Sequence, residues 1–120
     1  MKKLLLVLLV CIGFNTFSQE TVTSSQVKDY IGKEVFLVGK VAGSKQMISK
    51  SEQSILFINI DKDYPDNEIV IVVFSEVLSR LKFTETTLSG KTIKVKGKVG
   101  IFKEKPQIIL ANEANLTIIE

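Results

Sequence analysis

Alternation of apolar and polar side chains with a period of two runs through most of the chain and predicts β-strands. The predicted strands are residues 34–41, 54–61, 68–74, 91–103, 106–110 and 116–119. In the second strand the alternation places Leu56, Ile58 and Ile60 on the inner face and leaves Phe57 outside. Residues 68–74 are β-branched nearly throughout, which is typical of a strand covered on both faces.

Two segments depart from this period and predict short helices. Residues 26–31 follow the capping residues Thr23-Ser24-Ser25 and end at Gly32. Residues 75–83 begin at Ser75 and space their apolar side chains as a helix does. Polar segments at 43–53 and 84–90 indicate loops, residues 62–67 a turn, and Glu104-Lys105 a tight turn.

This order of elements predicts an all-β fold with little helix, a five-stranded Greek-key OB-fold barrel. Glycines inside the predicted first and fourth strands, at Gly39, Gly97 and Gly100, suit strands that bend sharply around a small barrel. The strand spacing also admits an SH3-like barrel. The helix between the third and fourth strands favours the OB-fold.

The N-terminus has the order of a secretory leader: a basic head, an apolar run at residues 4–13, and the small residues Thr16 and Ser18. We predict a signal peptide over residues 1–18 and one domain over 19–120, with its core at about 28–119. The apolar run is shorter than the roughly 20 residues that span a bilayer, although a membrane anchor is the alternative. A lipoprotein acylated at Cys11 is disfavoured, because Leu9-Val10 lacks the small residue that this processing prefers. We therefore expect export to the periplasm or the medium.

Composition narrows the chemistry further. The chain has 120 residues, a net charge of +3, no histidine and one cysteine, which lies in the predicted leader. Without histidine the usual catalytic triads and most transition-metal sites are excluded, and the domain has no thiol for a disulfide. An OB-fold nuclease of the staphylococcal type needs several arginines, whereas Arg80 is the only one. The sequence predicts a protein without enzymatic activity, cofactor or metal.

Acidic residues gather around one turn, at Asp61, Asp63, Asp66 and Glu68. They could hold Ca²⁺ weakly, but the glycine and terminal glutamate of a dedicated calcium loop are missing. A solubilising turn is the favoured interpretation.

Several short motifs together resemble one family. Residues 30–35 (YIGKEV) with 39–41 (GKV), 57–61 (FINID), 97–99 (GKV) and 105–108 (KPQI) follow the order and spacing of bacterial OB-fold nucleic-acid-binding domains of the tRNA-anticodon-binding type. The resemblance covers nearly the whole predicted domain. It departs at Asp61-Lys62-Asp63, where those domains often have an arginine and a second acid, and at Ile71, where they have a polar side chain.

The resemblance implies a site on the barrel surface. Phe57 matches an aromatic residue that stacks on a base, and Asn59 and Gln107 would contact polar base edges. The alternation of Lys94, Lys96 and Lys98 puts three ammonium groups on one strand face, spaced to follow phosphates. Two structural interpretations stay open. Phe57 could be buried beneath residues 43–53 or beneath the N-terminal helix, and the lysines could keep an exposed strand from pairing with another strand.

The prediction is thus an exported, monomeric, non-catalytic binding module for single-stranded DNA or RNA. The alternative is an interaction module of the cell envelope that binds a peptide, an oligosaccharide or a protein. The near-neutral charge left after removal of Lys2 and Lys3 favours this alternative, and Phe57 favours nucleic acid.

Overall fold

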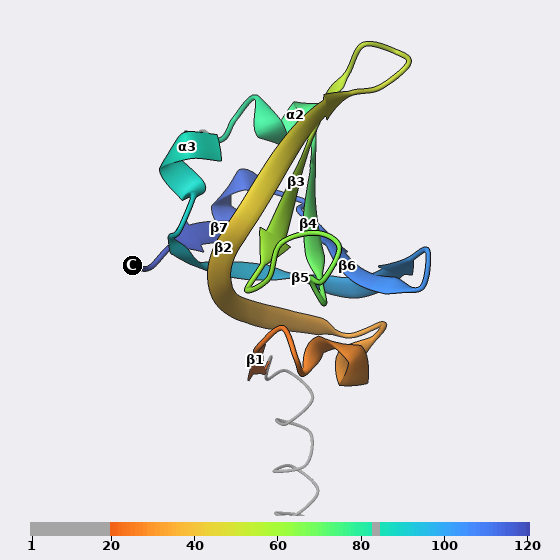
Figure 1. The fold of residues 1–120 in the computed structure, drawn as a ribbon, viewed down its shortest axis with the longest axis vertical. Helices are drawn as coiled ribbons and strands as arrows, with labels where there is room; N and C mark the ends of the chain where they lie inside the picture. The colour runs from red at the N-terminus through yellow and green to blue at the C-terminus, as the bar shows by residue number, and fades with distance from the viewer. Residues whose placement is uncertain (1–19, 83–84) are drawn as a thin grey trace, which may run out of the picture.

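The computed structural model describes residues 20–82 and 85–120 of the chain (Figure 1). The predicted leader and its cleavage after Ser18 lie outside the described residues. The strands are β1 (Thr21–Val22), β2 (Glu34–Ile48), β3 (Ser54–Ile60), β4 (Val70–Phe74), β5 (Thr92–Phe102), β6 (Lys105–Ile109) and β7 (Leu116–Ile118). Short helices are η1 (Val27–Tyr30), α2 (Ser75–Leu78), α3 (Glu85–Leu88) and η2 (Glu113–Asn115). Within the described part, no helix is long and apolar enough to cross a membrane.

Strand pairing forms a ring. β2 pairs antiparallel with β3, β3 with β4, and β5 with β6, while β4 and β6 pair in parallel. The ring returns to its start because the first part of β2 also pairs with β5. These five strands have the connectivity of an OB-fold, so the predicted fold class is confirmed. β1 and β7 extend the ring at two edges, along β2 and β5.

Two glycines allow the bent strands to approach each other closely. β2 pairs with β5 as far as Lys40 and with β3 from Val41 onward, so it turns from one sheet into the other (Figure 1). A Cβ atom on Gly39 would lie 2.3 Å from Cγ2 of Ile60, and one on Gly97 would lie 2.4 Å from Cγ2 of Ile108. Both distances are shorter than an ordinary carbon contact, so these positions require glycine.

The inner faces of the strands form one apolar core. Its members alternate along β2, β3 and β5 as the sequence predicts. α2 and α3 each add one buried side chain, Val77 and Leu88. The core members are Val22, Val27, Val35, Leu37, Val41, Leu56, Ile58, Ile60, Ile69, Ile71, Val73, Val77, Leu88, Ile93, Val95, Val99, Ile108, Leu110 and Leu116.

The predicted loop at 43–53 is wrong over its first half. β2 continues to Ile48, and residues 43–48 pair with β3 as a hairpin that extends beyond the ring (Figure 1). From Lys45 to Ile48 every side chain of β2 is exposed, although the paired residues of β3 include the buried Leu56. A strand whose own side chains are exposed on both faces shows no alternation in sequence, which is why this part of β2 was not predicted.

The helical predictions need smaller corrections. The N-terminal helix is the 3₁₀ turn η1, and Ser24 donates to Asp61 instead of capping it. The helix predicted at 75–83 is limited to α2; Phe83 lies outside the described residues. The predicted linker 84–90 contains α3, which buries Leu88. One apolar side chain in four residues is too little periodicity to predict a helix.

The tight turn falls one residue earlier than predicted. Lys103 and Glu104 form it, with φ angles of 52° and 66°. Two residues in the left-handed region are typical of a two-residue hairpin turn, which usually contains asparagine and glycine.

Candidate nucleic-acid interface

Rows of outward-facing side chains cross the sheet formed by β2, β3, β4 and β6. The strand register aligns Lys45, Phe57, Val72 and Ile109 in one row. The neighbouring row, nearer the β2–β3 hairpin turn, consists of Met47, Ile55 and Phe74. We refer to these seven residues as the open face.

The open face is apolar although it faces solvent. Phe74 is 44% exposed, and Met47 and Ile109 are each 46% exposed. Phe57 is half-buried between its cross-strand neighbours, and Val72 beside it is buried, although its side chain points outward. Apolar side chains that gather on the outward face of a sheet, with two aromatic rings among them, are a feature of many binding surfaces. The open face can therefore take flat apolar groups.

The segment 61–69, between β3 and β4, covers the other end of the same sheet (Figure 1). Asp63 lies over Gly43, where a Cβ atom would meet its carboxylate at 2.4 Å. The Asn59 amide donates to Asp63 (2.9 Å) and accepts from Asn67 (3.1 Å). Asn59 is thus 7% exposed, and its amide serves to hold the covering segment in place. In this conformation it is not available to contact a base edge, contrary to the expectation from sequence.

The ammonium group of Lys105, on β6, contacts the covering segment. Lys105 donates to the carbonyl of Pro65 (3.0 Å) and to Asn67 (3.2 Å), and its ammonium group lies 5.7 Å from the centre of the Tyr64 ring. Gln107 is half-buried in the row that contains Asn59, between Val70 and Gly100. Gln107 therefore lies on the same sheet surface as Phe57, at the covered end.

Lys94, Lys96 and Lys98 project from a different sheet. They alternate with the buried Ile93 and Val95 and face outward, as predicted. This part of β5 pairs with β2 and β7, whereas Phe57 belongs to the sheet formed by β2, β3, β4 and β6. The structure does not bring the three lysines and Phe57 together in one site.

The carboxylates at the predicted solubilising turn are used in local hydrogen bonds. Asp61 accepts from the backbone N–H of Lys40 (3.0 Å) and from the Ser24 hydroxyl (2.5 Å). Asp63 accepts from Asn59 and from the backbone of Tyr64. Over residues 20–82 and 85–120, no group of three His, Cys, Asp or Glu residues is arranged to hold a metal ion. The turn organises the covering segment and the bend of β2.

Sequence reasoning missed most of the open face. Phe74, Met47 and Ile109 were not proposed as site residues. Phe74 has the same parity as Val72 along β4, so its outward direction was readable. The signal that was lacking is the register, which alone shows that Phe74, Phe57 and Ile109 lie on adjacent strands.

No protein-family model matches the sequence, and no curated protein matches it. Similarity is found to solved structures. A chain in a crystal structure of yeast Stn1 and Ten1 matches 87% of this chain with a TM-score of 0.60 and 12% identity. The match covers 64% of that yeast chain, so this chain spans less than two-thirds of its length. This likeness supports the fold and extends no further.

Two further structures match with lower scores. The second OB-fold domain of replication protein A from Methanococcus maripaludis has a TM-score of 0.44 and 18% identity, over 75% of this chain and 87% of that domain. A Klebsiella pneumoniae lipoprotein, provisionally described as nucleic acid-binding, has a TM-score of 0.45 and 12% identity, over 81% of this chain and 78% of that one.

Proposed function

We propose that this protein is a non-catalytic OB-fold module that binds single-stranded nucleic acid on its open face. One observation carries the proposal: Phe57 and Phe74 lie on adjacent strands of an outward-facing sheet surface, among aliphatic side chains and beside Lys45. Aromatic rings on such a surface stack on bases of any sequence. The sequence resemblance to nucleic-acid-binding OB-fold domains points to the same sheet.

The charge around the open face is modest. Lys45 is its one cation, and Lys50 lies in the adjoining hairpin turn. Because each phosphate contact adds to the salt dependence of binding, we expect a shallow slope, about that of one or two contacts. Affinity is expected to come mainly from stacking and to tolerate differences in base sequence.

The proposal includes export, because the leader signals at residues 1–18 precede the domain. We also propose that the module acts without a cofactor or metal, because the chain has no histidine and the predicted domain no cysteine. The proposed oligomeric state is a monomer, and the proposed activity is binding rather than catalysis.

Fluorescence anisotropy with labelled single-stranded DNA and RNA tests the proposal, with duplex DNA for comparison. Phe74 is the position to vary, because its exposure lets the ring be removed with little effect on the core. Phe74→Leu should weaken binding about 5- to 150-fold, as expected for a lost stacking energy of about 1–3 kcal/mol. Phe74→Tyr keeps a ring and should bind as the wild type does. Ile119→Ala, at an exposed apolar position outside the open face, is the control.

The same series identifies the alternative class of partner. A peptide or protein that buries the apolar open face would favour a leucine about as much as a phenylalanine, since both are large and apolar. The near-neutral domain and the single lysine of the open face favour this second function. If no single strand binds, or if Phe74→Leu binds a strand as tightly as the wild type does, the nucleic-acid proposal is contradicted. The peptide or protein partner is then the remaining proposal.

A further inference from the structure

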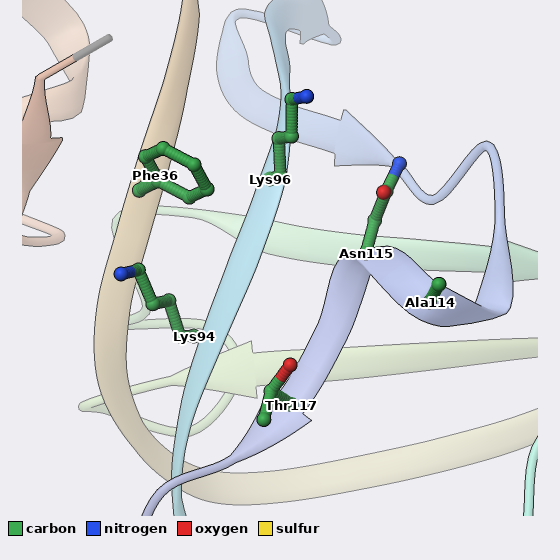
Figure 2. Close-up of a pocket in the computed structure, with 6 residues that line it drawn as sticks. All are labelled: Phe36, Lys94, Lys96, Ala114, Asn115 and Thr117. Atoms are coloured by element: carbon green, nitrogen blue, oxygen red, sulfur yellow. The ribbon is translucent and has the colours of Figure 1, made fainter.

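A second concave surface lies on the other sheet, away from the open face. It is a hollow of about 220 Å³ between β2, β5 and the C-terminal segment (Figure 2). Phe36 and Lys94 lie on one side, Asn115 and Thr117 on the other, and Lys96 projects from β5 between them. Its lining residues are Phe36, Lys94, Lys96, Ala114, Asn115 and Thr117.

The two lysines are arranged around the hollow by the strand and by Phe36. They occupy successive outward positions of β5, which are about 6.7 Å apart along a strand. The ammonium group of Lys94 lies 4.6 Å from the centre of the Phe36 ring, which holds it at one wall. Both lysines are half-buried, so their charges are less screened than those of fully exposed side chains.

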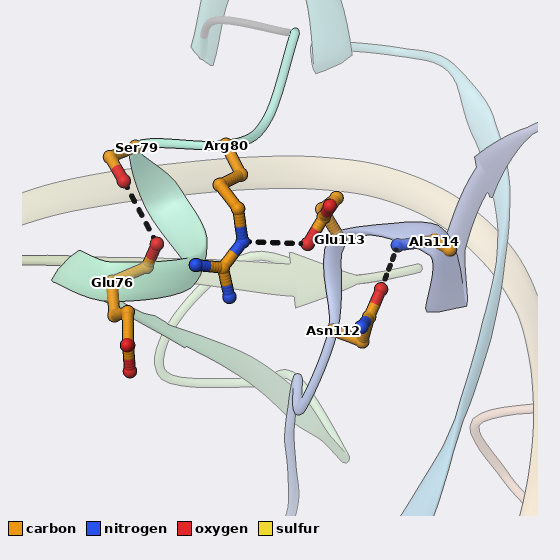
Figure 3. A network of polar contacts seen from close by, with 6 residues as sticks. All are labelled: Glu76, Ser79, Arg80, Asn112, Glu113 and Ala114. Carbon is orange, nitrogen blue, oxygen red and sulfur yellow. Dashed lines mark hydrogen bonds and ion pairs between the residues drawn. The ribbon is translucent and has the colours of Figure 1, made fainter.

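No carboxylate lines this hollow within the described part of the chain. The nearest candidate in sequence, Glu113, is turned to the helix side, where its Oε1 accepts from Nε of Arg80 at 2.9 Å (Figure 3). This hydrogen bond is the main reason that the pKa of Glu113 lies below its usual range. The Asn112 side chain accepts from the backbone of Ala114 (2.8 Å) and so fixes η2, the wall that carries Asn115. The hollow therefore keeps its positive charge.

We propose that this hollow binds a phosphate group of a ligand, with Lys94 and Lys96 as its charged partners. The amide of Asn115 and the hydroxyl of Thr117 supply neutral donors on the opposite wall, and a phosphate has enough acceptor oxygens for all four. Lys98 is not included, because Glu34 lies opposite it in the strand register. The phosphate can come from a small phosphorylated molecule or from a nucleic-acid backbone.

The site stands independently of the open face, so one can fail without the other. The test is a ¹H–¹⁵N NMR titration of the whole protein with sodium phosphate, with sodium acetate at equal ionic strength, and with single-stranded DNA. Phosphate should shift the amides of residues 94–96 and 115–117 in a saturable way, whereas acetate should not. If DNA also shifts these amides, the backbone is a source; if DNA leaves them unmoved while phosphate binds, the ligand is a small molecule.

Two variants complete the test. Lys94→Gln with Lys96→Gln should raise the phosphate dissociation constant at least tenfold, and Thr117→Asp should do so by repulsion. The matched control, Lys28→Gln with Lys82→Gln, removes two exposed lysines outside both the hollow and the open face and should leave phosphate binding unchanged. An unchanged dissociation constant in the first variant, an equal response to acetate, or no saturable shift with either phosphate or DNA would overturn the proposal.

Discussion

Gly97→Ala is expected to strain the fold at one identifiable atom. The added Cβ would lie 2.4 Å from Cγ2 of Ile108, a side chain of which no part is exposed. Ordinary carbon contacts are about 3.5–4.0 Å, so β5, β6 or the Ile108 side chain must move by about an ångström. Overpacking of this kind costs about 1–3 kcal/mol of unfolding free energy. Gly97 lies in an ordinary region of backbone conformation, so the cost is steric.

A double-mutant cycle isolates that contact. Ile108→Ala alone should cost about 2–5 kcal/mol, because it leaves a cavity in the core. In Gly97→Ala/Ile108→Ala the obstructing Cγ2 atom is gone and the new methyl group fills part of the cavity. The double variant should therefore be about 1–3 kcal/mol more stable than the sum of the two losses predicts.

Urea unfolding followed by far-ultraviolet circular dichroism measures all four proteins of the cycle. Gly100→Ala is the matched control on the same strand, because its Cβ would meet only the Gln107 carbonyl oxygen, at an ordinary 3.9 Å. It should change stability little. Strictly additive losses, or equal losses for Gly97→Ala and Gly100→Ala, would refute the close approach of β5 and β6.

Three further predictions concern one turn residue and two side-chain hydrogen bonds. Glu104→Gly should stabilise the protein by about 1 kcal/mol in a thermal melt, because Glu104 has a φ of 66° that glycine adopts without cost; no gain would contradict the turn. The pKa of Tyr30 is raised, chiefly because its hydroxyl donates to Glu20, so this contact stabilises the fold below the ordinary tyrosine pKa and is lost as pH rises through the raised value. Glu20→Gln should lower that pKa in a spectrophotometric titration. The lowered pKa of Glu113 means that its pair with Arg80 contributes above the ordinary glutamate range and is lost as pH falls through the lowered value. Arg80→Ala should return the pKa to its usual range in a carboxyl NMR titration.

The inner half of the fold was predictable because burial leaves a period in the sequence. Leu56, Ile58 and Ile60 alternate with outward residues, and all three are buried. A glycine inside a strand, at Gly97, indicated a bend or a close approach, although only the structure shows that Ile108 is the side chain that approaches it. In contrast, Leu88 is buried in a segment whose other residues are polar or glycine, so it leaves no period to detect.

The candidate site was less predictable because it depends on contacts between distant segments. Phe57 was placed outside correctly, but Asn59 is covered by Asp63 and Asn67, which fold back over it. Nothing in the local sequence shows that a turn will cover its own strand. The lysines of β5 and Phe57 were combined into one site because strand parity shows direction but not which sheet a residue joins.

The two proposed binding surfaces, the open face and the hollow, lie on different sheets and differ in chemistry. The open face offers rings for stacking and little charge, whereas the hollow offers two half-buried cations and no carboxylate within the described residues. A ligand that has both bases and phosphates could bind to the open face or to the hollow. The two proposals are therefore best tested by measurements that locate the contact, not only its strength.

The most direct such measurement is photocross-linking of the protein to a single strand that carries 5-iodouracil, followed by mass spectrometry of the linked peptide. Iodouracil reacts efficiently with an aromatic ring stacked on it, so the linked residue reports the stacking platform itself. We expect cross-links at Phe57 or Phe74. In Phe74→Leu the cross-link at residue 74 should be lost. Cross-links confined to residues outside the open face, or none at concentrations where the strand is bound, would contradict nucleic-acid binding on this surface.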